Sequence, residues 1–248
     1  MHRPTLIATT TFALALVALG GGGVAAEHDG ASPPGADTVK ETTEVHGRVP
    51  DDLLGRWLTV NQVKLPNGMV KPFARLWEVR RGAEHPEMVL RRVQMPDEVH
   101  EKMQDAAAAG EAWTPTPEDV HAVAESWDQL KETEAKYTRI ENKIYSADAY
   151  TPELNQDETT KGSDVALSTK ESFTGTQVLN TYTVWAVRQR TPEGFTGTFV
   201  TNTMAAAPMP IPIVLKGDVQ AYRLSGPAPA PVRSLSERLL DLFAGCRR

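Results

Sequence analysis

Hydrophobic and polar positions alternate in short runs between residues 49 and 225, and the runs end at turn signals such as Pro66-Asn67-Gly68. Alternation with a period of two is typical of a strand that buries one face. The last run shows it most clearly, because Ile211, Ile213 and Leu215 share one face. The pattern predicts eight strands, over residues 56–65, 72–80, 87–95, 137–145, 164–170, 177–190, 195–204 and 211–224.

The short connections between most of these runs favour antiparallel neighbours. Eight such strands suit a meander that closes on itself, so we expect a mainly β fold, an eight-stranded antiparallel up-and-down barrel over residues 49–225. A β-sandwich or another antiparallel barrel is the alternative.

The period changes to that of a helix between residues 96 and 135. Val99 and Met103 fall on one helical face, and Gly110 ends the run. Thr116, followed by Pro117 and then by Asp119, is typical of a capped helix start. We therefore expect a helical hairpin inserted between strands, packed against the barrel by Val99, Met103, Val120, Val123 and Trp127.

The two ends of the chain carry different signals. Arg3, an uncharged apolar stretch and the small residues Val24-Ala25-Ala26 form the pattern of a cleavable signal peptide over residues 1–26. The apolar stretch is short for a membrane span and ends in glycines, which argues against an anchor. Residues 27–48 are polar and predict a flexible leader. Residues 226–248 predict a Pro/Ala linker and a short amphipathic tail helix. From the signal-peptide pattern we expect an exported protein, periplasmic or extracellular.

The head of the first predicted strand resembles that of a known family. Gly55-x-Trp57 follows a predicted helical turn, as in lipocalin-type (calycin) barrels. In that family the tryptophan plugs the closed end of the barrel, and an arginine near the end of the last strand stacks across it. Arg223 stands at that place, and a predicted helix follows. The resemblance implies a structural plug of Trp57 and Arg223, although the family's T-D-x motif has no match and the helical hairpin is an addition.

Charge and cysteine content narrow the range of partners. The chain has 26 Lys and Arg against 32 Asp and Glu, a formal net charge of −6. No basic tract stands out, which argues against nucleic acid and anionic membranes as partners. The one cysteine, Cys246, lies near the C-terminus, so a disulfide could form only between two chains, as in a dimer.

No catalytic or cofactor motif is recognisable in the sequence. A G-x-S-x-G turn, a phosphate-binding glycine loop and an H-E-x-x-H helix are all missing. His100 and His121 on the inserted helices could meet as a metal site with Glu101 or Glu125, but surface histidines on polar helices are the simpler interpretation. We predict no catalytic residue, no cofactor and no metal.

Large apolar residues, most of them aromatic, indicate a binding function instead. Trp77, Trp185, Phe199 and Ile213 are candidates for the inside of the barrel, where they would line a ligand cavity or fill the core. The strand over 137–145 has polar residues on both faces, which indicates a wet or partly polar interior, or an imperfectly closed sheet. The first hypothesis is a binding protein for a small hydrophobic or amphiphilic molecule, with the helical hairpin as a lid or wall. A cell-envelope protein whose filled barrel docks a protein partner is the alternative, and an enzyme of unrecognised type comes third.

Overall fold

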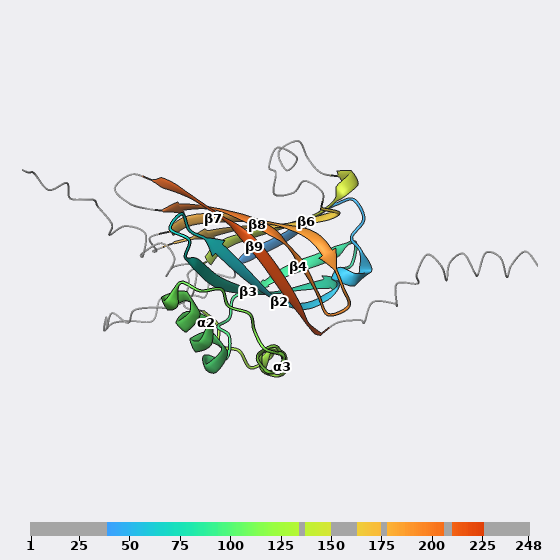
Figure 1. Ribbon diagram of the computed structural model, residues 1–248. Coiled ribbons are helices and arrows are strands. Elements are labelled where there is room, and N and C mark those ends of the chain that lie inside the picture. The colour runs from blue at the N-terminus through green and yellow to red at the C-terminus, as the bar shows by residue number, and fades with distance from the viewer. Residues whose placement is uncertain (1–38, 134–136, 150–162, 175–177, 206–209, 226–248) are drawn as a thin grey trace, which may run out of the picture.

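The computed structural model describes residues 39–133, 137–149, 163–174, 178–205 and 210–225. They form one nine-stranded sheet that curls into a nearly closed barrel (Figure 1). Its order is β1-β5-β6-β7-β8-β9-β2-β3-β4. The strands are β1 (Lys40–His46), β2 (Gly55–Lys64), β3 (Val70–Arg81), β4 (Pro86–Arg91), β5 (Tyr137–Ser146), β6 (Val165–Phe173), β7 (Val178–Arg190), β8 (Gly194–Ala205) and β9 (Ile211–Ser225).

All eight predicted strands are present, as β2 to β9. β4 stops at Arg91 rather than at Met95, and β6 continues to Phe173 rather than ending at Lys170. From β5 through to β4 in the sheet, every neighbouring pair is antiparallel. The barrel is therefore confirmed, but the prediction of eight purely antiparallel strands is wrong, because a ninth strand, β1, joins β5 in parallel.

β1 arises from residues 27–48, which were expected to be a flexible leader. Its polar sequence contains a period of two, since Glu41, Thr43 and Val45 are half-buried while Thr42 and Glu44 between them are exposed. The leader prediction is therefore wrong over 40–46. The composition of residues 27–48 indicated too few apolar side chains for an ordered strand. The inward polar side chains of β1, however, form hydrogen bonds with another strand.

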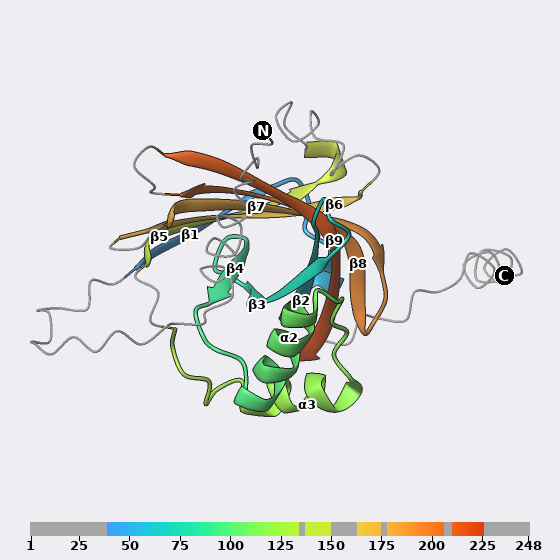
Figure 2. The ribbon, with the colours of Figure 1, turned by 60° about the vertical axis from the view of Figure 1, so that its left-hand side comes forward.

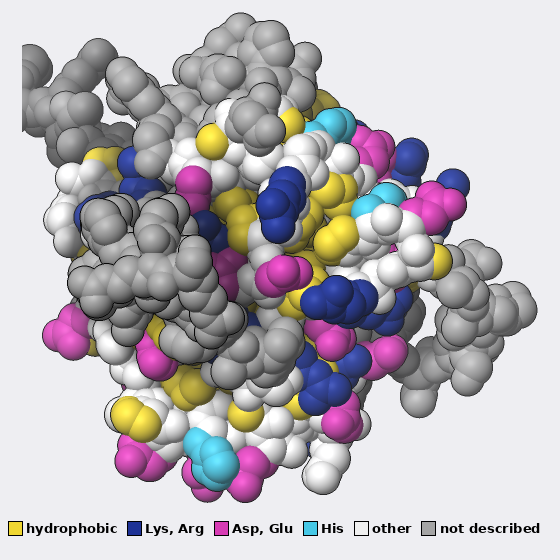
Figure 3. Space-filling model, turned by 90° about the vertical axis from the view of Figure 1, so that its right-hand side faces the viewer, with side chains coloured by type: hydrophobic (Ala, Val, Ile, Leu, Met, Phe, Trp, Pro, Cys, Tyr) yellow, Lys and Arg dark blue, Asp and Glu magenta, His cyan; other side chains and the backbone are white. Residues whose placement is uncertain are grey.

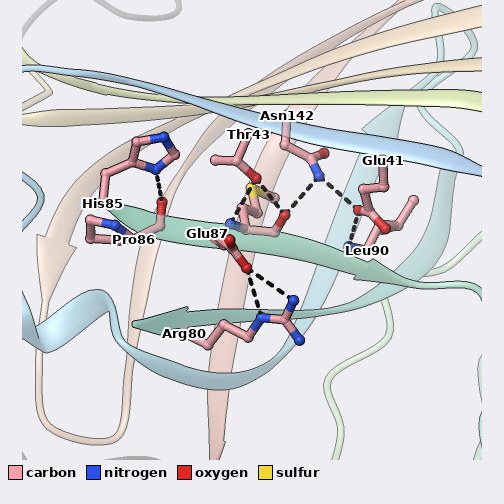
Figure 4. A network of polar contacts seen from close by, with 9 residues as sticks. Glu41, Thr43, Arg80, His85, Pro86, Glu87, Leu90 and Asn142 are labelled. Atoms are coloured by element: carbon pink, nitrogen blue, oxygen red, sulfur yellow. Dashed lines mark hydrogen bonds and ion pairs between the residues drawn. The ribbon is translucent and has the colours of Figure 1, made fainter. Parts of the chain in front are cut away.

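Those partners form the seam that closes the barrel between β1 and β4 (Figure 4). The Thr43 hydroxyl donates to the Met88 carbonyl oxygen at 2.8 Å and accepts from the Met88 amide at 3.1 Å. The Leu90 amide donates to the Glu41 carboxylate at 2.8 Å, and Asn142 Nδ2 donates to both Glu41 and Met88 at 2.8 Å. Side chains of β1 and β5 thus satisfy backbone groups of β4 at the seam, where a strand edge would otherwise be exposed.

One end of the barrel is filled by aromatic side chains. Trp57 is 1% exposed and stacks on Trp77 with a centroid separation of 5.5 Å, while Phe195 lies 5.4 Å from Trp57. The guanidinium carbon of Arg223 is 4.4 Å from the Trp57 ring centroid, so the contact expected from the resemblance is present. Arg223 Nη1 also donates to the Leu54 carbonyl oxygen at 2.7 Å, which joins the last strand to the segment before the first antiparallel strand.

The helices α2 (Asp97–Ala109) and α3 (Pro117–Ser126) confirm the predicted hairpin. The capping box is present, because the Asp119 amide donates to the Thr116 hydroxyl at 3.2 Å and the Thr116 amide donates to the Asp119 carboxylate at 3.0 Å. Both helices lie outside the β2, β3 and β9 side of the barrel (Figure 2). Their apolar residues Val99, Met103, Val123 and Trp127 pack with Leu58, Val60 and Leu76, so the hairpin is an outer layer on the wall rather than a lid.

The signal-peptide segment, the tail helix and Cys246 lie outside the described residues. Within the described ranges, no helix is long and apolar enough to cross a membrane. On the face shown in Figure 3, basic and acidic side chains lie intermixed. Two short 3-10 turns, Asp51–Leu53 and Ala147–Ala149, complete the described elements.

Candidate functional site

Part of the barrel interior is polar. Most of its hydroxyl and amide groups are paired: the Thr183 and Thr201 hydroxyls are 3.0 Å apart, and Trp185 Nε1 donates to Asn61 Oδ1 at 2.7 Å. Buried polar groups are costly unless they are hydrogen-bonded, so these pairs stabilise an interior of this composition. The buried polar side chains that share a strand face with core residues are Thr59, Asn61, Asn142, Thr169, Glu171, Thr181, Thr183, Thr201 and Thr203.

Glu171 on β6 is the exception to this pairing. Its side chain is fully buried, and neither carboxylate oxygen accepts a hydrogen bond from the described residues. Arg75 Nη2 on β3 lies 3.5 Å from Glu171 Oε1. The Tyr137 phenol on β5 interacts with the same carboxylate without completing a hydrogen bond of normal geometry. We call Arg75, Tyr137 and Glu171 the Glu171 cluster.

Burial and mutual attraction oppose each other in this cluster. Burial raises the pKa of Glu171, and the attraction of Arg75 and the Tyr137 phenol only partly offsets it. Burial is the largest effect on Arg75 and lowers its pKa, but the charges of Glu171 and Tyr137 together outweigh it, so the pKa of Arg75 is raised. Burial, followed by the Glu171 charge, raises the pKa of Tyr137 to about 12. Of the three groups in the cluster, the Glu171 carboxylate is therefore the one whose ionised form is stabilised least by its surroundings.

The cluster lies beside an opening in the barrel wall. β4 pairs with β3 only as far as Leu76 and Arg91, so β3 continues toward Val70 without β4 beside it. A cavity of about 50 Å³ is found at this place. Its volume suits a few water molecules or a polar head group, and it is well below that of a cavity enclosing a whole ligand. We call it the wall pocket; its lining includes Arg75, Tyr137, Leu76, Leu90, Val93 and Met95.

Two further arginines line the wall pocket and differ in their partners. Arg91 Nη2 donates to the Trp127 carbonyl oxygen at 3.1 Å, and its guanidinium carbon lies 5.2 Å from the Trp127 ring centroid. Arg92 has no ion-pair partner among the described residues, and its charge acts on the Tyr137 phenol. The wall pocket therefore has an excess of positive charge, since Glu171 faces Arg75 alone and Arg92 has no ion-pair partner in the described part of the chain.

The predicted ligand contacts lie in the packed interior, except one. Trp77 and Trp185 are 0% and 1% exposed, and the ring centroids of Phe199 and Phe73 are 5.5 Å apart. Ile213 is only partly buried against this core. Trp77, Trp185 and Phe199 thus already have protein partners on several sides, and their contact with a ligand remains a prediction.

The predicted alternative of a metal site finds no support in the described residues. His121 Nε2 lies 3.1 Å from the Glu125 carboxylate, and both side chains are largely exposed. No group of three or more His, Cys, Asp or Glu residues in the described ranges is arranged to hold a metal ion, at His100 or elsewhere.

The Glu171 cluster was missed in the sequence because its members lie far apart in the chain. One signal was available: Val165, Leu167, Thr169 and Glu171 alternate on one face, and extending the strand over 164–170 by one residue would have placed a carboxylate inside the barrel. The polar faces seen over 137–145 gave the second hint, since Asn142 is 1% exposed. Neither signal could identify Arg75 as the ionic partner.

Comparison of the chain with protein-family models, with curated protein sequences and with solved structures found no match. The functional argument therefore rests on the geometry of the barrel and of the Glu171 cluster.

Proposed function

We propose that the protein is an exported binding protein that takes a small amphiphilic molecule, with the polar head group of that molecule in the wall pocket. The observation that carries the proposal is the fully buried Glu171 carboxylate, which accepts no hydrogen bond of normal geometry from the described residues and stands next to a pocket lined by Arg75 and Tyr137. The export part rests on the signal-peptide pattern of residues 1–26.

The energetic cost of the cluster supports a ligand-binding role. A buried ionisable group without hydrogen bonds lowers stability, and such groups concentrate at functional sites. The interior around Glu171 shows that this fold can pair its buried polar groups, as Asn142 does with Thr169 at 3.0 Å. A buried carboxylate that accepts no hydrogen bond and lies 3.5 Å from an arginine is therefore better explained by a site that a ligand completes than by packing.

The lining and the volume of the wall pocket suit an amphiphile. Arg75, Arg92 and Tyr137 provide donors for a head group, whereas Leu76, Val93 and Met95 provide apolar contacts. A cavity of about 50 Å³ accommodates the head group alone. The apolar chain of the ligand would extend from it over the neighbouring apolar side chains.

A binding assay with purified mature protein tests the proposal. An environment-sensitive apolar dye should bind saturably and be displaced by single-chain amphiphiles. Arg75→Met keeps the apolar part of the side chain and removes the charged donors, so affinity for the amphiphile should fall about tenfold or more. Arg80→Met is the matched control, because Arg80 lies on the same strand but is 57% exposed and pairs with Glu87.

Equal affinities for wild type, Arg75→Met and Arg80→Met would contradict the assignment of the site. No saturable binding by the wild-type protein would contradict the binding function itself. The second candidate, an envelope protein that docks a protein partner, would then be favoured by the exposed apolar side chains Leu179, Ile211 and Val214.

A further inference from the structure

The geometry of the Glu171 cluster implies a competition for one cation. Arg75 is one of the residues that line the wall pocket, and its guanidinium lies 3.5 Å from the Glu171 carboxylate. Among the described residues it has no other ionic partner. A head group that enters the pocket therefore meets a guanidinium already facing an internal anion.

We infer that the head group is anionic, that it replaces Glu171 as the partner of Arg75, and that Glu171 takes up one proton from solvent as the ligand binds. The inference rests on the proposed function and adds the charge of the ligand and its proton linkage. The proton ends on a carboxylate oxygen of Glu171, so the net charge of the cluster with its bound anion equals that of the empty cluster.

The charge of the head group follows from the groups that face the pocket. Arg75 contributes from β3, Arg91 ends β4 and Arg92 follows it, and all three are cations. The Tyr137 phenol from β5 is neutral at physiological pH, because its pKa is about 12. A cationic head group would meet three arginines, whereas an anionic one would meet Arg92, which has no ion-pair partner among the described residues, and could then take Arg75.

The proton uptake follows from burial. Glu171 is 0% exposed, and Glu41 on β1 is a second carboxylate whose charge disfavours ionisation of Glu171. Once a ligand anion takes Arg75, the Glu171 carboxylate would be a buried charge beside another anion. A carboxylate in that position becomes protonated rather than remaining charged. Affinity for the anion must therefore fall as the pH rises, by up to about tenfold per pH unit above the pKa of Glu171.

The test uses amphiphiles whose head groups do not titrate. Octanesulfonate, octanol and octyltrimethylammonium have the same chain and carry a permanent negative charge, no charge and a permanent positive charge. Their dissociation constants are measured across about pH 5–9 for wild type, Glu171→Gln and the control Glu78→Gln. Glu78 is a half-buried glutamate on β3 that pairs with Arg56 on another face of the strand, so its replacement leaves the pocket intact.

Wild type and Glu78→Gln should bind octanesulfonate in preference to the other two probes and lose affinity as the pH rises. Glu171→Gln should bind octanesulfonate at least as tightly at every pH, with little pH dependence. Octanesulfonate binding that has the same pH profile in wild type and Glu171→Gln would overturn the proton linkage, and a preference for octanol or octyltrimethylammonium would overturn the anionic head group. Either result leaves the proposed function standing, whereas failure of all three probes to bind contradicts the proposed function itself.

Discussion

The contact between Trp57 and Arg223 gives the sharpest stability prediction. Trp57 is 1% exposed, packs on Trp77 and Phe195, and donates from Nε1 to the Leu53 carbonyl oxygen at 2.9 Å. Trp57→Ala should therefore cost about 3–5 kcal/mol, the usual effect of removing a buried tryptophan. Arg223→Met removes the charge that lies 4.4 Å from the ring, together with its hydrogen bonds to backbone oxygens.

A double-mutant cycle separates the stacking energy from these other losses. Urea unfolding of wild type, Trp57→Ala, Arg223→Met and the double variant, followed by far-UV circular dichroism, gives the coupling between the two side chains. A partly desolvated guanidinium over an indole should yield about 1–2 kcal/mol. The pair of Arg56 and Trp127 provides the comparison, because it lies at 5.2 Å and the Arg56 side chain is 31% exposed, so its coupling should be about 0.5 kcal/mol.

Two outcomes would refute this reasoning. A coupling of Trp57 and Arg223 below about 0.3 kcal/mol, within the error of additivity, would show that the two side chains are neighbours without a stabilising interaction. A coupling smaller than that of Arg56 and Trp127 would show that the shorter separation, 4.4 Å against 5.2 Å, does not strengthen the contact. Either result would leave the plug as packing alone.

The remaining two predictions concern the seam and the Glu171 cluster. Thr43→Val removes the acceptor of the Met88 amide, so amide exchange at Met88 measured by NMR should speed up about tenfold. The Leu90 amide, which donates to Glu41, is the internal control, and equal acceleration at both amides would indicate general destabilisation instead. Because burial raises the pKa of Glu171 in the folded protein, the stability that this residue contributes is full below its unfolded pKa of about 4.3 and is lost as the pH rises through the folded pKa. In urea unfolding, Glu171→Gln should therefore gain stability relative to wild type as the pH rises from about 5 to 8, and a constant difference would contradict this.

Local pattern was sufficient for most of the elements. The antiparallel strands alternate because one face meets the core, and the start of α3 at Pro117 follows from a cap whose groups are all within four residues. β1 could not be found in this way, because the Glu41 and Thr43 side chains bond to the backbone of β4, which is more than forty residues away along the chain. Periodicity measures burial of apolar groups, and this strand is held mainly by polar ones.

The candidate site required information of the same non-local kind. Glu171 and Arg75 are adjacent only because the sheet closes and brings β3 and β6 to face one another across the barrel. The sequence predicted a polar interior from the strand over 137–145, and Asn142 confirms that part. The spacing of residues along the chain does not give distances across the barrel. The sequence therefore could not show which buried polar group would lack a hydrogen-bond partner.

The two parts of the barrel interior have different roles in our proposal: the Trp57 end stabilises the fold, and the region of Glu171 binds a ligand. Around Trp57 the aromatic rings contact one another and Arg223 donates hydrogen bonds to backbone oxygens, so this end supplies apolar burial. Around Glu171 a well-packed apolar or amide side chain would stabilise the fold more than an ion pair at 3.5 Å with free carboxylate oxygens. The fold carries that cost next to the place where β4 ends and the wall opens. A group that lowers stability at a packed position would be unexplained, but at an opening it can be compensated by a ligand, which is why we place binding there.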